Sequence, residues 1–232
     1  MAVKTPIDKA KLRHHIQYNG WKYALLVIIS IFLVDLVYTM TAYRPPEDKR
    51  IDVYIQSAGA DQDAVDSIFE KMRVDLLPDM ELIRSYLLVA GGSDDVAAIQ
   101  QLSTYIAAGE GDIYLLRSED FKRYASQGAF VDLSDAVEQG VLHTGDIDLS
   151  GGYVAIQEYD DKTDAMIAVS QRRLYGIPLS QLPGLMDEFL INNDGLYMSM
   201  TVYNGNDENV IRFMDELIAR TAVSHVPEGL MP

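Results

Sequence analysis

Three short polar stretches of this 232-residue chain could bind a ligand, because each follows a run of residues that predicts a β-strand. They are residues 57–59, 91–93 and 117–119. In an open parallel sheet, binding loops lie beyond the carboxyl ends of the strands. We therefore expect five residues of the first and third stretches to contact a ligand, namely Ser57, Gly59, Arg117, Ser118 and Glu119.

The serines of these stretches also fit a structural role as helix caps. Ser93 and Ser118 each precede acidic residues and an amphipathic run, which is typical of a helix N-terminus. Capping is the favoured interpretation for both serines. Arg117 is the sharper candidate for ligand binding, because a helix cap does not require a guanidinium group.

The sequence contains no recognisable catalytic or metal-binding pattern. His143 and His225 stand alone, no cysteine is present, and no nucleophile elbow, zinc-protease or nucleotide-binding motif occurs. The acidic groups within 61–66 and 204–208 lack the spacing of a calcium loop, and both precede predicted helices, where acids are favoured. We expect a protein that is not an enzyme and has no cofactor, metal site or catalytic residue. An exported hydrolase that uses acidic residues is the alternative.

The charge of the chain is unevenly distributed and argues against nucleic-acid binding. The formal net charge is −16, yet residues 1–43 carry five basic groups against two acids. That segment is therefore +3 and the remainder is −19. So acidic a body repels phosphate backbones and lacks a basic stripe, which excludes DNA and RNA as expected partners.

Residues 23–43 predict a membrane-spanning helix, because these 21 residues carry a single charge and match the thickness of a bilayer. Aromatic residues at both ends suit the two interfaces, and the basic flank places the N-terminus in the cytoplasm. We divide the chain into a cytoplasmic segment 1–20, a transmembrane helix 21–43, a linker 44–50 and an extracellular domain 51–232. The alternative is a cleaved secretory signal, but no good small-x-small cleavage site follows the apolar run.

Asp35 places a carboxylate inside this span, at a cost on the order of 2.5 to 3.5 kcal/mol on insertion scales. Helical spacing puts Asp35, Tyr38, Thr39 and Ala42 on one face. A polar stripe of this kind suits another membrane helix better than lipid, so we expect these four residues to contact a membrane partner. The alternative is an acid that merely leans toward the headgroups.

Beyond the linker, predicted strands and helices alternate. Strands are expected within 51–59, 80–92 and 112–117, and each is followed by an amphipathic helix, so parallel pairing is expected. Residues 153–159 and 165–179 predict two further strands around a polar turn, and residues 196–203 and 210–218 predict a last strand and a closing helix. Near the N-terminus, a short helix is expected to end at Asn19-Gly20.

The segment GEGDIYLLRSEDFKRYASQGAFVDLSDAV, residues 109–137, resembles bacterial extracellular solute-binding proteins of ABC importers. RLYGIPL at 173–179 resembles the crossover strand of that family, and the stretch beginning LYMSMTVY resembles its returning strand and helix. The resemblance covers residues 51–140 and, more loosely, 165–220. It implies an α/β lobe with a mainly parallel sheet flanked by helices, and it adds Tyr175 to the expected ligand-binding residues.

The chain departs from that family at the place where a second lobe is normally inserted, because only residues 180–195 occupy it. We therefore expect a one-lobed, membrane-anchored relative. Its expected function is that of an accessory subunit that docks on or regulates a transporter, with ABC permease subunits and the lipid bilayer as partners. The alternative is a tethered receptor that binds a small solute or peptide in an open half-cleft.

Overall fold

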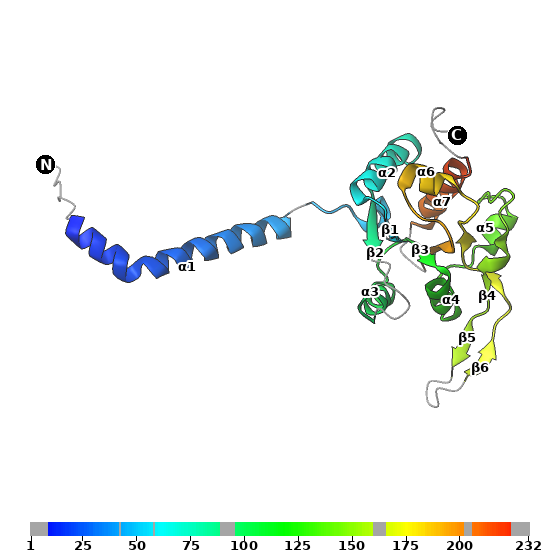
Figure 1. Cartoon of the computed structure of the whole chain (residues 1–232), viewed down its shortest axis with the longest axis horizontal. Coiled ribbons are helices and arrows are strands. Elements are labelled where there is room, and N and C mark those ends of the chain that lie inside the picture. Colours follow the sequence, from blue (N-terminus) through cyan, green and yellow to red (C-terminus); the bar gives the residue numbers. More distant parts are fainter. Residues whose placement is uncertain are drawn as a thin grey trace. The chain divides into compact units, whose positions relative to one another are not determined.

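The structure is a computed structural model that describes residues 9–41, 43–57, 59–88, 96–159, 166–201 and 206–223. The chain divides into two compact units, Met1–Arg44 and Pro45–Pro232. In the described residues, the first unit is one long helix and the second is a mixed α/β body (Figure 1).

Helix α1, Lys9–Thr41, is a candidate membrane span by length and composition. Its segment Gln17–Thr41 has 25 residues, a mean hydropathy of 2.3 and no buried residue. Ser30 and Thr41 each donate a hydrogen bond to the carbonyl oxygen four residues earlier, at 2.8 and 2.7 Å. These hydroxyl groups are thus satisfied within the helix, as an apolar environment requires.

The predicted end of a helix at Asn19-Gly20 is wrong, because α1 runs through both residues. A glycine ends a helix when it adopts a left-handed conformation, and Gly20 is not among the residues with positive φ. A glycine inside a helix costs only about 1 kcal/mol relative to alanine, which the long run of helical residues on either side can tolerate.

Three of the four residues predicted to contact a membrane partner, Asp35, Tyr38 and Thr39, lie on α1. Asp35 and Tyr38 are exposed, and the Thr39 hydroxyl donates to the Asp35 carbonyl oxygen at 2.8 Å. Ala42 lies outside the described residues.

Five strands form the central sheet of the body in the order β2-β1-β3-β9-β8. Their bounds are Arg50–Gln56 for β1, Leu82–Leu88 for β2, Ile113–Arg117 for β3, Ile177–Pro178 for β8 and Leu196–Met200 for β9. Strand β1 pairs in parallel with β2 and β3, whereas β9 runs antiparallel to both β3 and β8. Four of the five strands therefore point the same way, which confirms the predicted mainly parallel sheet.

Helices cover both faces of this sheet (Figure 1). Figure 1 shows α2, α6 and α7 on one side and α3 and α4 on the other. Their bounds are Gln62–Leu76 for α2, Val96–Ala107 for α3, Ser118–Ser126 for α4, Gly184–Phe189 for α6 and Asp207–Thr221 for α7. The shorter elements are η1 Glu47–Lys49, α5 Ser134–Glu138 and η2 Leu149–Gly152. The helices after β1, β2 and β3 follow the predicted alternation of strand and helix.

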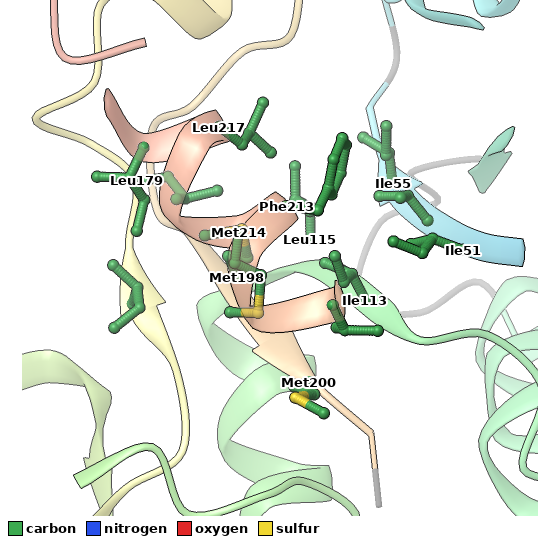
Figure 2. Close-up of a cluster of buried hydrophobic side chains, with 14 of the residues drawn as sticks. Ile51, Ile55, Ile113, Leu115, Leu179, Met198, Met200, Phe213, Met214 and Leu217 are labelled. Carbon is green, nitrogen blue, oxygen red and sulfur yellow. The ribbon is translucent and has the colours of Figure 1, made fainter. Parts of the chain in front are cut away.

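The core on the α7 side is apolar and follows the strand period of two. Along β1, Ile51, Val53 and Ile55 are fully buried on this side. Figure 2 shows Phe213, Met214 and Leu217 of α7 together with side chains of β1, β3 and β9. The rings of Phe69 and Phe213 meet edge to face with their centroids 5.1 Å apart, so α2 packs against α7 through this aromatic pair.

The core on the opposite face contains a row of tyrosines across three strands. Tyr54 of β1 is in register with Tyr86 of β2 and Tyr114 of β3. Its ring stacks on theirs at centroid distances of 4.8 and 4.9 Å. Gly111, at φ +81°, lets the chain pass this row, because a Cβ there would lie 2.5 Å from the Tyr54 ring.

The predicted strands at 153–159 and 165–179 are divided into shorter pieces. They contain β4 Tyr153–Val154, β5 Gln157–Tyr159, β6 Met166–Val169 and β7 Arg173–Leu174, in addition to β8. Strand β4 pairs with β7 and β5 pairs with β6, both antiparallel, so a two-part ribbon leaves the body before β8 joins the main sheet. Figure 1 shows β5 and β6 extending away from the five-stranded sheet.

Two buried carboxyl groups lie at the amino ends of β1 and β3. Asp112 is 4% exposed and its Oδ2 accepts a hydrogen bond from the backbone N–H of Asp52 at 2.6 Å. The Asp52 carboxylate forms an ion pair with Arg50 at 3.2 Å. Burial raises the pKa of both acids, and that of Asp112 rises to about 7.

We predict that Asp112→Asn flattens the pH dependence of stability. The pKa of Asp112 is about 7 in the folded protein against an ordinary value of 3.8. The folded state thus holds this proton more tightly, so the free energy of unfolding falls as the pH rises from about 4 to above 7. Asparagine keeps an oxygen acceptor for Asp52 but cannot ionise, so the variant should lose about 3 kcal/mol less between pH 5 and pH 8.

The measurement is urea unfolding of the full chain in a non-ionic detergent, followed by circular dichroism at pH 5 and pH 8. Asp146→Asn is the matched control, because it makes the same charge change at an exposed position. Identical pH profiles for wild type and Asp112→Asn would contradict the prediction.

Candidate functional site

A pocket of about 720 Å³ lies at the carboxyl ends of β1 and β3. Two loops form one side of it, the β1–α2 loop and the β3–α4 junction, with the start of α3 nearby. All five residues expected at the strand ends line it, namely Ser57, Gly59, Arg117, Ser118 and Glu119. The stretch 91–93, which was also expected at this edge, lies outside the described residues.

Tyr175 does not line the pocket. It is 6% exposed and belongs to the hydrophobic cluster formed with Phe121, Tyr124 and other residues of the α4 side. The residue that the resemblance added to the expected ligand-binding set is therefore a core residue in this chain.

Gln56, the last residue of β1, joins the elements that form the floor of the pocket. Its side-chain oxygen accepts the backbone N–H of Arg117 at 2.8 Å, and its Nε2 donates to Oδ2 of Asp120 at 2.8 Å. The other oxygen of Asp120 pairs with Arg123 at 3.2 Å. Gln56 was not among the residues predicted from the sequence, although a polar residue at the end of an otherwise apolar strand is a usable signal.

The predicted role of Ser118 as the N-cap of α4 is wrong. Helix α4 begins at Ser118 itself, and Arg117 occupies the cap position without a side-chain cap bond. The backbone N–H of Ser118 donates instead to the carbonyl of Gly195 at 2.9 Å, and that of Arg117 to Gln56. Tertiary partners thus satisfy two N–H groups at this end, and the serine is a lining residue of the pocket.

Arg117 places a guanidinium group at the pocket. Its side chain is exposed, and within the described part of the chain its guanidinium makes no hydrogen bond or ion pair. Arg123, the other arginine of the lining, is already paired with Asp120. Arg117 can therefore offer its full set of donors to a bound group.

The facing wall of the pocket comes from the segment between β8 and β9, residues 180–195, for which the sequence predicted no element and no ligand contact. Met186 and Leu190 line the pocket and are 52% and 56% exposed. Leu190 has a left-handed φ of 55°, a strained backbone state for leucine. Asn193 holds the segment in place by donating to the carbonyls of Leu179 and Leu182, each at 2.9 Å.

The lining combines hydrogen-bonding groups with apolar surface. Ser57, Arg117, Ser118 and Asn192 provide polar atoms, whereas Ile99, Met186 and Leu190 provide apolar contact. Among the described residues, no group of three or more acidic or histidine side chains could hold a metal ion. The arrangement is suited to non-covalent binding of a small polar molecule.

We predict that Gln56→Leu loosens the junction between β1, β3 and α4. Leucine has a similar volume but leaves the Arg117 N–H and the Asp120 carboxylate without this partner, at a cost of about 1 to 3 kcal/mol. Hydrogen exchange at the Arg117 amide should become faster, while the amide exchange rates in α7 should rank in the same order as in the wild type. Unchanged protection at Arg117 would contradict the role given to Gln56.

No family model and no curated protein matches the sequence. Solved structures do match, and they include five extracellular solute-binding or ABC-transporter binding proteins.

Three of these structures illustrate the similarity. An extracellular solute-binding protein family 1 member from Alicyclobacillus acidocaldarius has 22% identity over 59% of this chain, with a TM-score of 0.37. An ABC substrate-binding protein from Listeria monocytogenes, in complex with cycloalternan, has 20% identity over 55%, with a TM-score of 0.37. The galacto-N-biose-/lacto-N-biose I-binding protein from Bifidobacterium longum has 16% identity over 56%, with a TM-score of 0.38. The aligned part spans 28% of each of these three proteins, and they are of the same class that residues 109–137 resemble.

Proposed function

We propose that this chain is a non-enzymatic, membrane-anchored module that binds a small polar ligand in the pocket at the carboxyl edge of its sheet. The observation that carries the proposal is the unpaired guanidinium of Arg117 in a pocket of about 720 Å³. Ligand pockets in proteins commonly measure about 300 to 1,000 Å³ and combine apolar walls with a few convergent polar groups.

The distribution of apolar surface favours ligand binding over protein docking at this edge. In the described body, the exposed large apolar residues are few and belong to different elements, and Met186 and Leu190 are the two that line the pocket. A docking surface would require a broad contiguous apolar patch. The accessory role expected from the sequence therefore finds less support in the body than the receptor role does.

The accessory role is kept as a second candidate because of α1. Asp35 is an exposed carboxylate within a 25-residue candidate span, and charged residues at such positions commonly face another protein segment. On this proposal the helix anchors the chain with its N-terminus in the cytoplasm, and its Asp35 face contacts a transporter permease subunit. The ligand-binding body then lies on the extracellular side.

We predict that Arg117→Ala weakens ligand binding by about tenfold, because an unpaired guanidinium that meets a polar ligand contributes a charge-assisted hydrogen bond. The full chain in non-ionic detergent is titrated calorimetrically with a panel of sugars, amino acids, short peptides and carboxylates. Lys71→Ala is the control, because Lys71 is an exposed cation on α2 away from the pocket lining. Equal affinities of the two variants, or a panel without any binder, would count against the proposal.

A second prediction concerns the face of α1 that carries Asp35. A photocrosslinking amino acid at Thr39, on the same face, should form adducts with one membrane protein in the native membrane, whereas Val37, on the opposite face, should not. Asp35→Leu should reduce the Thr39 adduct at least several-fold, because it removes the polar group that favours a protein neighbour. Equal yields from Thr39 and Val37 would indicate a lipid-facing helix.

A further inference from the structure

A second hollow of about 550 Å³ lies beside α4, between that helix and the ribbon strand β4. It shares only Glu119 and Arg123 with the first pocket. Its other lining residues come from later in α4, from η2 and from the ribbon, namely Lys122, Ser126, Gly151, Tyr153, Val154, Ala155, Gln157 and Arg172.

The α4 side of this hollow is one stripe of the helix. Glu119, Lys122, Arg123 and Ser126 follow one another at spacings of three, one and three residues, which places them on the same face. The opposite face, which contains Phe121, is buried against the sheet and fixes the direction of the stripe. Two adjacent cations are thus presented on a rigid helix rather than on a loop.

The ribbon side contributes a third cation that is held in place. Arg172 donates from Nε and Nη2 to the carbonyl oxygen of Tyr153, at 3.2 and 2.6 Å. Tyr153 in turn pairs with Leu174 across the β4–β7 ribbon. The Asp120 carboxylate holds the guanidinium of Arg123 in a similar way at 3.2 Å. Because both guanidiniums are already ordered, binding an anion there costs little additional side-chain entropy.

The charge of the hollow is opposite to that of the body around it. Three cations and one carboxylate line it, whereas residues 44–232 as a whole carry −19. Within the described residues, the Lys122 ammonium makes no hydrogen bond or ion pair. Distant carboxylates are screened beyond about 8 to 10 Å at physiological ionic strength. Even with Arg123 counted as neutralised by Asp120, Lys122 and Arg172 outnumber the single carboxylate of the lining, Glu119, so the hollow prefers an anion.

We propose that this hollow binds an oxyanion of the phosphate class, separately from the ligand of the first pocket. Arginine presents planar donors that match phosphate oxygens, and lysine adds a point charge, which together form a common phosphate-binding set. The same group could belong to a soluble phosphorylated molecule or to an anionic lipid headgroup.

The probe is inorganic phosphate, measured by equilibrium dialysis with the full chain in a phosphate-free maltoside detergent. Lys122→Gln and Arg172→Gln should each weaken binding about fivefold to tenfold, because each removes one charge-assisted contact. Glu119→Gln should strengthen it, because that change removes the one carboxylate of the lining. Glutamine at position 172 can still donate to the Tyr153 carbonyl, so the ribbon should remain intact.

Two controls separate this site from other effects. Lys71→Gln makes the same charge change on α2, and Arg117→Ala alters the first pocket alone, so both should bind phosphate as the wild type does. Adding phosphatidylglycerol to the micelles distinguishes the sources, because a lipid headgroup would compete with the dialysed phosphate and a soluble ligand would leave its binding unchanged.

Absence of saturable phosphate binding, or equal weakening by Lys71→Gln and Lys122→Gln, would overturn the proposal. Loss of phosphate binding in Arg117→Ala would show that the two pockets are one site, which would also overturn it. Failure of the Arg117 ligand titration, by contrast, would leave this inference untouched.

Discussion

The structure depends on β1, a strand that is buried on both faces and closed at its carboxyl end by a glutamine. Parallel partners on both sides satisfy its backbone, and its apolar residues alternate between the α7 core and the tyrosine row. A polar side chain at the end of such a strand needs hydrogen-bond partners within the protein, and Gln56, 8% exposed, finds them in the Arg117 N–H and the Asp120 carboxylate. The same two bonds that satisfy the amide therefore orient the start of α4 and the floor of the pocket.

Periodicity was sufficient to predict the parts of the fold in which each element is long and amphipathic. Strands β1 to β3, α2 and α7 agree with the predicted pattern, because residues such as Phe69 and Phe213 recur at helical spacing and are deeply buried. The ribbon was harder to predict from the sequence, because two-residue strands such as β4 and β7 are defined by their pairing and are too short to show a periodic pattern. The prediction that a helix ends at Gly20 was wrong for a related reason. A glycine permits the left-handed conformation that ends a helix but does not require it, and Gly20 does not adopt it.

The candidate site was predictable on one side only. The positions of the strand ends predicted five lining residues, because the carboxyl ends of parallel strands lie at the same edge of a sheet. They are Ser57, Gly59, Arg117, Ser118 and Glu119. The opposite wall, with Met186 and Leu190, comes from a segment without periodicity whose position depends on the amide of Asn193. Ser118 shows the limit of local rules, since its N–H, one of the free donors in the first turn of α4, is accepted by the carbonyl of Gly195, which is distant in sequence.

The antiparallel direction of β9 has a consequence for how this body could diversify. Because β9 runs against β8, the chain leaves one strand and enters the next at the same edge of the sheet, where the pocket lies. Residues 180–195 are therefore a connection that begins and ends beside the pocket, and its length can change without altering the order of the strands. The entropy of closing a loop grows only slowly with length, so evolution can insert or delete residues there and reshape recognition while the scaffold stays constant.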